Sequence, residues 1–335
     1  MAVASRRTTP SKRPARAGRF AFGLLAVLAG SAAADDGGAP WLLYRDANPF
    51  VAASGLPFAP PSAAPERWRV DLVLAASNTE LAFDRGREHL RYDGEIHEAR
   101  LALTRAFGER WLARATLGGA RFGRGFLDGF IEDFHRAFGF DNGDRGHLGG
   151  NGHTIAYDDG HGDRVLLDRP LRAATPLLLD LAAHTPAGGH EWMYGATLKL
   201  PTSHASPLVD DRATDLSLWF AAQSTDETTR WPWGARVGLM QRGNTRLLPQ
   251  RAHERVPFAD AVLGWRPHPR WDVAAQLQWH GALYASDIPL LQSAATLSLS
   301  SAWHARQGWT LRAGLVEDAI PRHAQDVTFF LSLVL

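Results

Sequence analysis

The sequence predicts an all-β protein: a transmembrane, antiparallel, up-and-down β-barrel of about 12 strands, with a short amphipathic helix in an outer loop. Three observations predict this fold. A polar turn, a tryptophan and an alternating apolar–polar run follow one another six times along the chain. No segment after residue 34 reaches the roughly 18 consecutive apolar residues of a membrane-spanning helix. The chain also closes on an alternating run that ends at its last residue.

The first 34 residues have the pattern of a secretory signal peptide. They contain six basic and no acidic residues, and they continue through the apolar run Phe20–Ala29 to the small residues Ser31–Ala34. A basic region, a short apolar region and a small-residue cleavage site define such a signal. The alternative is an uncleaved anchor, but the apolar run is shorter than the roughly 20 residues that span a bilayer. We therefore predict a signal peptide at residues 1–34.

A segment rich in proline and alanine separates this signal from the first strand. It includes Pro57, Pro60, Pro61 and Pro65, which discourage regular structure. We predict a periplasmic N-terminal lead at residues 35–66 and an outer-membrane barrel at residues 67–335.

Charge and cysteine content argue against several functional classes. Removal of the signal peptide takes away six basic residues and no acidic one, so the formal net charge falls from +1 to about −5, whereas nucleic-acid binders usually carry a basic surface. The chain has no cysteine, which excludes disulfides, thiolate metal ligands and thiol nucleophiles.

Six strands are predicted to begin at tryptophans that follow polar turns. After Trp192, for example, Tyr194, Ala196 and Leu198 share one face, and smaller or polar residues alternate with them. Alternation over about 8 to 10 residues indicates a strand with one apolar face, and aromatic residues at its ends are typical of membrane barrels. Tryptophan favours the membrane–water interface, so these residues are expected to form one rim. The six strands start at Trp68, Trp111, Trp192, Trp231 or Trp233, Trp271 and Trp309.

Six returning strands make the number even, as in bacterial barrels. The short turns before the tryptophans are expected to face the periplasm, and the longer connections to face outward. The predicted returning strands are Glu95–Phe107, Pro176–His184, Asp215–Gln223, Phe258–Arg266, Ser293–Ala305 and Gln325–Leu335. The predicted outer loops are Thr79–Gly94, Gly123–Thr175, Pro201–Thr214, Gln241–Pro257, Ala285–Gln292 and Val316–Ala324.

The final strand resembles the C-terminal signal that the barrel-assembly machinery recognises. Its apolar face consists of Val327, Phe329, Leu331, Leu333 and Leu335. The sequence departs from the usual signal at its last residue, where most such proteins have phenylalanine or tryptophan. The alternative interpretation is an ordinary edge strand.

Several short segments resemble a family of proteobacterial outer-membrane β-barrels that is known as a domain of unknown function. They are Arg45–Phe50 with Gly55–Pro57, the segment Gly125–His135, and Val316–Asp318. The likeness spans most of residues 41–335, and Phe126–Ile131 is its most specific part. The resemblance implies an outer-membrane barrel, and it implies no established activity and no catalytic residues.

The polar face of the strands is expected to line the barrel interior. Basic and acidic side chains are nearly balanced there, whereas a selective ion channel usually favours one sign. The interior is therefore either a water-filled path for a charged solute or a plug closed by ion pairs. The predicted lumen-lining and solute-binding residues are Arg69, Asp71, Glu98, Arg100, Arg114, Asp180, Lys199, Asp215, Arg236, Asp260, Gln276, Gln278, His280, His304 and Arg312.

The second outer loop is predicted to contain the amphipathic helix. Phe126, Phe130, Phe134 and Phe138 recur every four residues beside Ile131, and acidic residues lie off this stripe. The helix either packs on the barrel mouth as a structural element, or serves as a lid, a plug or a face that lies on the outer leaflet.

The sequence gives little support for metal, cofactor or catalytic chemistry. The loop Asp141–Asp163 is rich in aspartate and histidine, but its spacing matches no defined calcium or zinc site. Ser203 with His204, or Ser300 with His304, supplies the residue types of a serine nucleophile and its base, but no nucleophile motif surrounds them. We predict no metal, no cofactor and no enzymatic activity.

The preferred function is therefore a channel or binding protein for a small solute in the Gram-negative outer membrane. The first alternative is a plugged barrel that maintains the envelope, and the second is a lipid-modifying enzyme at the rim. A soluble periplasmic β-sandwich is a further alternative. The expected partners are outer-membrane lipid and lipopolysaccharide, the barrel-assembly machinery and a small solute, but not nucleic acid.

Overall fold

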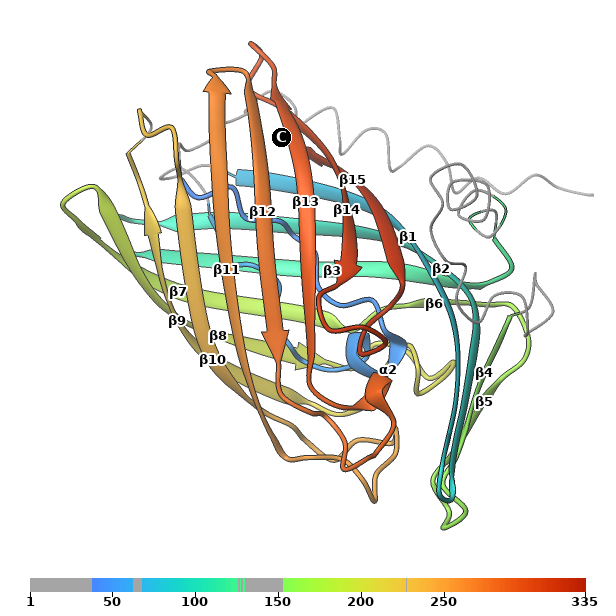
Figure 1. Ribbon diagram of the computed structural model, residues 1–335. Helices are drawn as coiled ribbons and strands as arrows, with labels where there is room; N and C mark the ends of the chain where they lie inside the picture. The colour runs from blue at the N-terminus through green and yellow to red at the C-terminus, as the bar shows by residue number, and fades with distance from the viewer. Residues whose placement is uncertain (1–37, 63–67, 126, 128, 130–152, 227) are drawn as a thin grey trace, which may run out of the picture.

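The computed structural model describes residues 38–335 except 63–67, 126, 128, 130–152 and 227. Twelve long strands form a closed antiparallel barrel (Figure 1). They are β1 (Trp68–Arg85), β2 (Glu88–Phe107), β3 (Trp111–Gly123), β7 (Leu177–Ala187), β8 (His190–Leu200), β9 (Asp215–Ser224), β10 (Trp233–Gln241), β11 (Arg255–His268), β12 (Trp271–His280), β13 (Ala294–His304), β14 (Thr310–Asp318) and β15 (Val327–Val334). The predicted fold and strand number are confirmed.

The first and last strands close the barrel. Each strand pairs with its neighbours along the chain, and β1 pairs with β15 from Asp71 opposite Val334 to Asn78 opposite Val327. The last residue extends this seam, because Leu335 and Val70 exchange both backbone hydrogen bonds, at 2.8 and 2.9 Å. Closure leaves no sheet edge with unpaired backbone groups, as a barrel in lipid requires.

The first outer connection differs from the prediction of a loop at Thr79–Gly94. Strands β1 and β2 remain paired as far as Arg85 opposite Glu88, and a two-residue turn with Gly86 at φ 61° joins them. Polar residues in this stretch indicated a loop, but Leu81 and Tyr92 still alternate and are buried. The hairpin therefore projects far beyond the other strands, and β4 (Thr154–Asp158) and β5 (Arg164–Leu167) lie along it (Figure 1).

A third short strand, β6 (Leu171–Ala174), pairs with the outer end of β3. Beyond these strands, the loop described between β3 and β4 is limited to a few residues. The predicted amphipathic helix at 126–138 falls largely outside the described residues, and of that segment Leu127 and Gly129 are described, both in helical conformation.

The strands present one apolar face outward. Leu74, Leu218 and Val237 are more than half exposed, although they are large apolar residues in mid-strand. Tryptophans at the starts of strands, such as Trp68 and Trp111, are also exposed, and strand pairing places them at the end of the barrel where Leu335 lies. An apolar band with an aromatic rim is the surface that membrane barrels present to lipid. No helix in the described part of the chain has the length and apolar character needed to cross a membrane.

The N-terminal segment lies inside the barrel. Residues 38–62 run through the interior and include the short helix α2 (Pro49–Ala52), whose start is capped by the Asn48 side chain (Figure 1). This position differs from the periplasmic lead that we predicted for residues 35–66. The prolines do discourage regular structure, but the segment gains its order from contacts with distant strands rather than from its own sequence.

The main apolar core fills the outer end of the barrel. Phe50 from α2 packs edge-on against Tyr157 and Tyr284, with ring centroids 6.3 and 6.5 Å apart. Leu247 and Leu291 from outer connections belong to the same buried cluster, the latter in the 3₁₀ turn Pro289–Leu291. Helix α2 is thus held between the strands and the outer loops.

Candidate functional site

The structure places the predicted lumen-lining residues on the inner face of the barrel. They face inward because they alternate with exposed apolar residues, and directly neighbouring residues of a strand point to opposite faces. Two of them, Arg69 and His304, are partly exposed. The buried ones are Asp71, Glu98, Arg100, Arg114, Asp180, Lys199, Asp215, Arg236, Asp260, Gln276, Gln278, His280 and Arg312.

Basic and acidic residues of the inner wall neutralise one another in pairs. Arg114 Nε lies 2.8 Å from Asp180 Oδ2, and these residues are directly opposite on β3 and β7. Arg236 pairs in the same way with Asp260 across β10 and β11, at 2.6 Å. Burial of a charge is costly unless it is paired and hydrogen-bonded, so this pairing is what allows a charged interior. Three further pairs are Arg69–Asp71, Arg100–Glu98 and Arg312–Asp272.

Wall side chains also bind the backbone of the N-terminal segment. Gln276 accepts a hydrogen bond from the Leu42 N–H at 2.9 Å and donates one to the Leu42 carbonyl at 3.4 Å. Gln325 accepts from the Ala47 N–H at 3.1 Å. An unpaired buried backbone group costs free energy. These contacts pair backbone groups of the segment with polar side chains of the wall, so both have hydrogen-bond partners.

The paired arginines of the wall serve the segment as well. Arg114 donates to the Ala59 carbonyl at 2.6 Å, and Arg236 donates to the carbonyls of Phe58 and Pro57. A guanidinium has five N–H donors, so it satisfies a carboxylate and a carbonyl together. The same side chains therefore line the wall and hold the segment in place.

Arg45 folds the segment back on itself. Its guanidinium donates to the carbonyls of Ala52, at 2.6 Å, of Ser54, at 3.1 Å, and of Leu56. It also lies over the Phe58 ring, 4.8 Å from the centroid. These carbonyls belong to the last residue of α2 and to the residues just after it, where a helix leaves acceptors unpaired.

Lys199 is the centre of a fully buried charge cluster near the outer loops. Its Nζ binds Asp211 and lies 3.5 Å from Asp215 Oδ2, and Arg242 binds Asp211 at 3.1 Å. Asp215 in turn accepts from the Gly55 N–H at 2.8 Å. Burial raises the pKa of Tyr284, whose ring lies 5.0 Å below the Arg242 guanidinium, to about 12.

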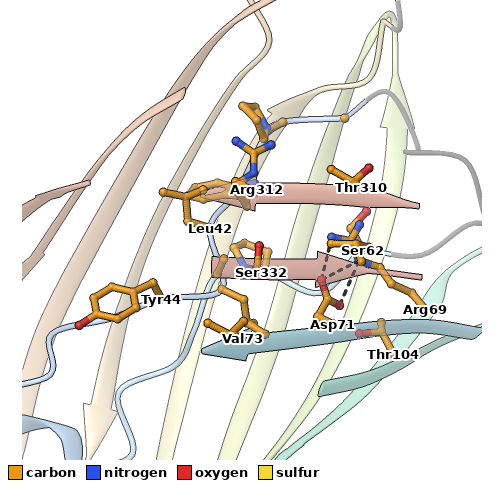
Figure 2. Close-up of a pocket in the computed structure, with 18 of the residues that line it drawn as sticks. Leu42, Tyr44, Ser62, Arg69, Asp71, Val73, Thr104, Thr310, Arg312 and Ser332 are labelled. Carbon is orange, nitrogen blue, oxygen red and sulfur yellow. Dashed lines mark hydrogen bonds and ion pairs between the residues drawn. The ribbon is translucent and has the colours of Figure 1, made fainter. Parts of the chain in front are cut away.

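Small cavities remain between the segment and the wall. One lies at the end with the chain terminus, between the segment and β1, β14 and β15, and has a volume of about 70 Å³ (Figure 2). Leu42, Asp71, Thr310 and Arg312 line it, and Arg69 and Asp71 pair at its edge. Pockets for small molecules usually measure about 300–1,000 Å³. The interior in this conformation is therefore filled.

The family model described as "Protein of unknown function (DUF3187)" matches residues 25–334, which include the strands and the interior segment. The chain belongs to this family. This match confirms the resemblance to a family of unknown function that the sequence indicated. No curated protein is significantly similar to this DUF3187 chain in sequence.

A solved structure shares the fold of the DUF3187 chain. An outer membrane channel from Pseudomonas putida F1 is similar with a TM-score of 0.55 and 10% sequence identity, over 81% of this chain and 96% of that one. The NanC porin has a TM-score of 0.46 and 9% identity, over 79% and 98% of the two chains. At its TM-score of 0.55, the Pseudomonas putida structure shows a common barrel fold.

Sequence reasoning missed part of the DUF3187 interior. Asp272 alternates in step with Gln276 and Gln278 along β12, so the sequence pattern already indicated that it faces the interior. Asp211 and Arg242 lie in outer loops, where alternation gives no signal. Asp46 lies in the N-terminal segment, where it meets His280 at 3.3 Å.

The residues considered for catalysis have other partners in the DUF3187 structure. The ring nitrogens of His304 lie 2.6 Å from Asp272 and 3.0 Å from Thr310, while the Ser300 hydroxyl accepts from Arg312. The Ser203 hydroxyl accepts from the Ala205 N–H. Among the described residues, no group of three or more acidic or histidine side chains is arranged to hold a metal.

Proposed function

We propose that this DUF3187 protein is an outer-membrane channel for a small polar solute, and that its N-terminal segment, residues 38–62, is the gate. The main support for this proposal is that the segment occupies the lumen and is held there by hydrogen bonds to charged wall residues such as Arg114 and Arg236. Beside the apolar packing of side chains such as Tyr44 and Phe50, the segment and the wall exchange these polar contacts. Water is able to replace such contacts when the segment moves.

The chemistry of the lumen favours a path over a permanent seal. A barrel that serves only as a support gains more stability from an apolar filling, because buried ion pairs barely recover their desolvation cost. The wall instead keeps pairs such as Arg236–Asp260 beneath the segment. These side chains remain paired and become hydrated once the lumen opens. The wall is therefore stable in both the closed and the open state.

The outer membrane is the compartment that fits the surface. Exposed apolar residues form a band outside the barrel, and a closed barrel is one of two structures that satisfy all backbone groups in lipid. The predicted signal peptide agrees with export. The likeness to a Pseudomonas putida outer membrane channel supports the same assignment at the level of fold.

A permanently plugged barrel is the second candidate. It is favoured by the small volume of the interior cavities, about 70 Å³ or less among those described beside the segment. The two candidates share one structure and differ in whether residues 38–62 move.

A reversible disulfide between segment and wall tests the gate. The chain has no cysteine, so an introduced pair is unique. A Cβ built on Gly55 lies 3.1 Å from Lys199 Cβ, close to the roughly 3.5–4.5 Å of a disulfide. It also lies 2.5 Å from Asp215 Cβ, so the chain must shift slightly to admit the cysteine, and heat-dependent gel migration verifies that each variant is folded. We expect the wild-type protein to show openings in a planar bilayer. Oxidised Gly55→Cys/Lys199→Cys protein should be silent, and reduction should restore its openings.

The single variants Gly55→Cys and Lys199→Cys are the controls, and their openings should not depend on redox state. Openings that persist in the fully oxidised double variant would contradict a gate formed by this segment. A silent wild-type protein that is shown to be inserted and folded would favour the plugged barrel.

A further inference from the structure

Two arginines lie directly opposite each other on the outside of the barrel. Strand pairing places Arg121 of β3 opposite Arg172 of β6, and it places His97 of β2 on the other side of Arg121. Residues that are directly opposite in a sheet point to the same face. Both arginines are exposed, whereas Phe122 next to Arg121 is buried, so this row faces outward.

The row lies at the level of the outer membrane interface. Trp111 begins β3 at the aromatic rim, and Arg121 follows ten residues later on the same face. A membrane barrel strand needs about 9–11 residues to cross the hydrocarbon region. Arg121 is thus at the opposite interface, where lipid headgroups lie.

The charge of this row is not balanced by the residues that the structure describes. Within the part of the chain that the structure describes, no acidic side chain forms an ion pair with Arg121 or Arg172. Glu95, the nearest acid in the strand phase of His97 on β2, is buried and binds His97 at 3.1 Å and the Leu127 N–H. Like charges directly opposite each other destabilise a sheet. An anion placed between the two guanidiniums removes this repulsion.

A shallow, wide-open hollow in the outer surface adjoins the row. Small outward residues on β2 and β3, Ala99 and Gly119, form its floor, and Leu74, Leu299 and Leu331 form its apolar side. These three leucines are 57%, 46% and 43% exposed. Arg121 and Arg172 lie on its border. The surface therefore combines a cationic end at the interface with an apolar groove toward the membrane interior.

We propose that this surface binds a phosphorylated lipid of the outer leaflet, such as lipopolysaccharide. Arg121 and Arg172 hold the phosphate, because guanidinium groups bind phosphate through two parallel charge-assisted hydrogen bonds. The acyl chains occupy the hollow, where they cover the exposed leucines. A soluble anion would leave the apolar groove empty. A soluble protein does not reach this face, because the membrane covers it. The site is separate from the channel and does not depend on it.

Lipid binding by the purified mature chain in detergent tests the proposal, with bis-phosphorylated lipid A as the probe and native mass spectrometry as the readout. We expect Arg121→Gln/Arg172→Gln to bind at least about tenfold more weakly than wild type, since hydrogen bonds to charged groups are the stronger class. Arg164→Gln/Arg255→Gln removes two other exposed arginines away from the hollow and should bind like wild type. Gly119→Phe should fill the groove and also weaken binding.

Dephosphorylated lipid and inorganic phosphate separate the possible sources of the anion. Wild-type protein should prefer the phosphorylated lipid by about tenfold or more, a comparison that needs no variant. Equal binding of the two lipids, or unchanged binding by Arg121→Gln/Arg172→Gln, would overturn the proposal. Displacement of the lipid by inorganic phosphate at the same concentration would show an ion site instead and would overturn it too. Heat-dependent gel migration verifies that each variant is folded.

Discussion

At the scale of single residues, a repeated pairing of glycine with an aromatic ring shapes the inner wall. Gly195, Gly238 and Gly314 lie directly opposite Trp219, Phe258 and Phe330. A Cβ added to any of these glycines would lie within 2.3 to 2.6 Å of the opposite ring. The ring thus lies flat over the glycine, which lets a wide side chain fit the curved inner face.

Gly238→Ala is expected to destabilise the barrel. Its Cβ would meet Phe258 Cζ at 2.3 Å and the Leu218 carbonyl oxygen at 2.7 Å, and the carbonyl belongs to a hydrogen-bonded strand. Overpacking of this kind costs about 1–3 kcal/mol. The temperature at which the folded gel band converts to the unfolded band should fall. Gly119→Ala is the control, because its Cβ would meet the Ala173 carbonyl oxygen at an ordinary 3.6 Å, and an equal loss in both variants would contradict the argument.

At the scale of elements, a charged network ties the outer connections together. Arg251 of the β10–β11 connection binds Glu88 at the β1–β2 turn and Asp159 after β4. Glu88 also accepts from Ser286, at 2.8 Å, and from the Tyr157 hydroxyl, at 3.1 Å. Four segments that are distant in the sequence therefore meet above the outer end of the barrel.

Acidification is expected to loosen this network through Asp159. Burial raises the pKa of Asp159, but hydrogen bonds from the His161 N–H and from Arg251 outweigh it and hold the pKa below the ordinary 3.8. A carboxyl with a lowered pKa stabilises the fold above its unfolded-state pKa, and this contribution is lost as the pH falls through the folded-state pKa. Pepsin should therefore cut wild-type residues 153–167 faster at about pH 2.5 than at about pH 4.5.

The matched control for this prediction is Asp159→Asn, which has no carboxyl to titrate. Its cleavage relative to wild type should be faster at about pH 4.5, and the difference should become smaller at about pH 2.5. Burial raises the pKa of the neighbouring Asp163, and so does the nearby Asp159 charge, so its effect runs in the opposite direction and only the part due to burial remains in both proteins. The same ratio of cleavage rates at both pH values would show that Asp159 does not hold the network.

The elements also show what the sequence is able to predict. Alternation is local, so the sequence alone is sufficient to find the twelve barrel strands and to assign Arg114 and Asp260 to the inner face, although it missed the long β1–β2 hairpin and the short strands β4, β5 and β6. Alternation does not locate the N-terminal segment, because contacts such as Leu42 with Gln276 join residues far apart in the chain. Loop residues such as Asp211 carry no periodic signal, and their place in the Lys199 cluster follows from the fold alone.

At the scale of the whole molecule, the wall and the interior segment are two separable systems. The seam between β1 and β15 and the pairs Arg114–Asp180 and Arg312–Asp272 lie within the wall itself. The segment adds contacts to this wall and completes the apolar cluster around Phe50. Strand pairing does not depend on it, so a barrel without the segment retains its hydrogen-bonded structure and its internal charge pairs.

Deletion of residues 38–62 is therefore expected to leave a folded, open barrel. The variant should still show heat-dependent gel migration, but at a lower transition temperature, because Tyr157 and Tyr284 lose their packing against Phe50. Its conductance in a planar bilayer should be larger and steadier than that of wild type, since water replaces the segment along the charged wall. Failure of the variant to form a barrel would show that the segment is required for assembly. The barrel wall would then not be stable without residues 38–62.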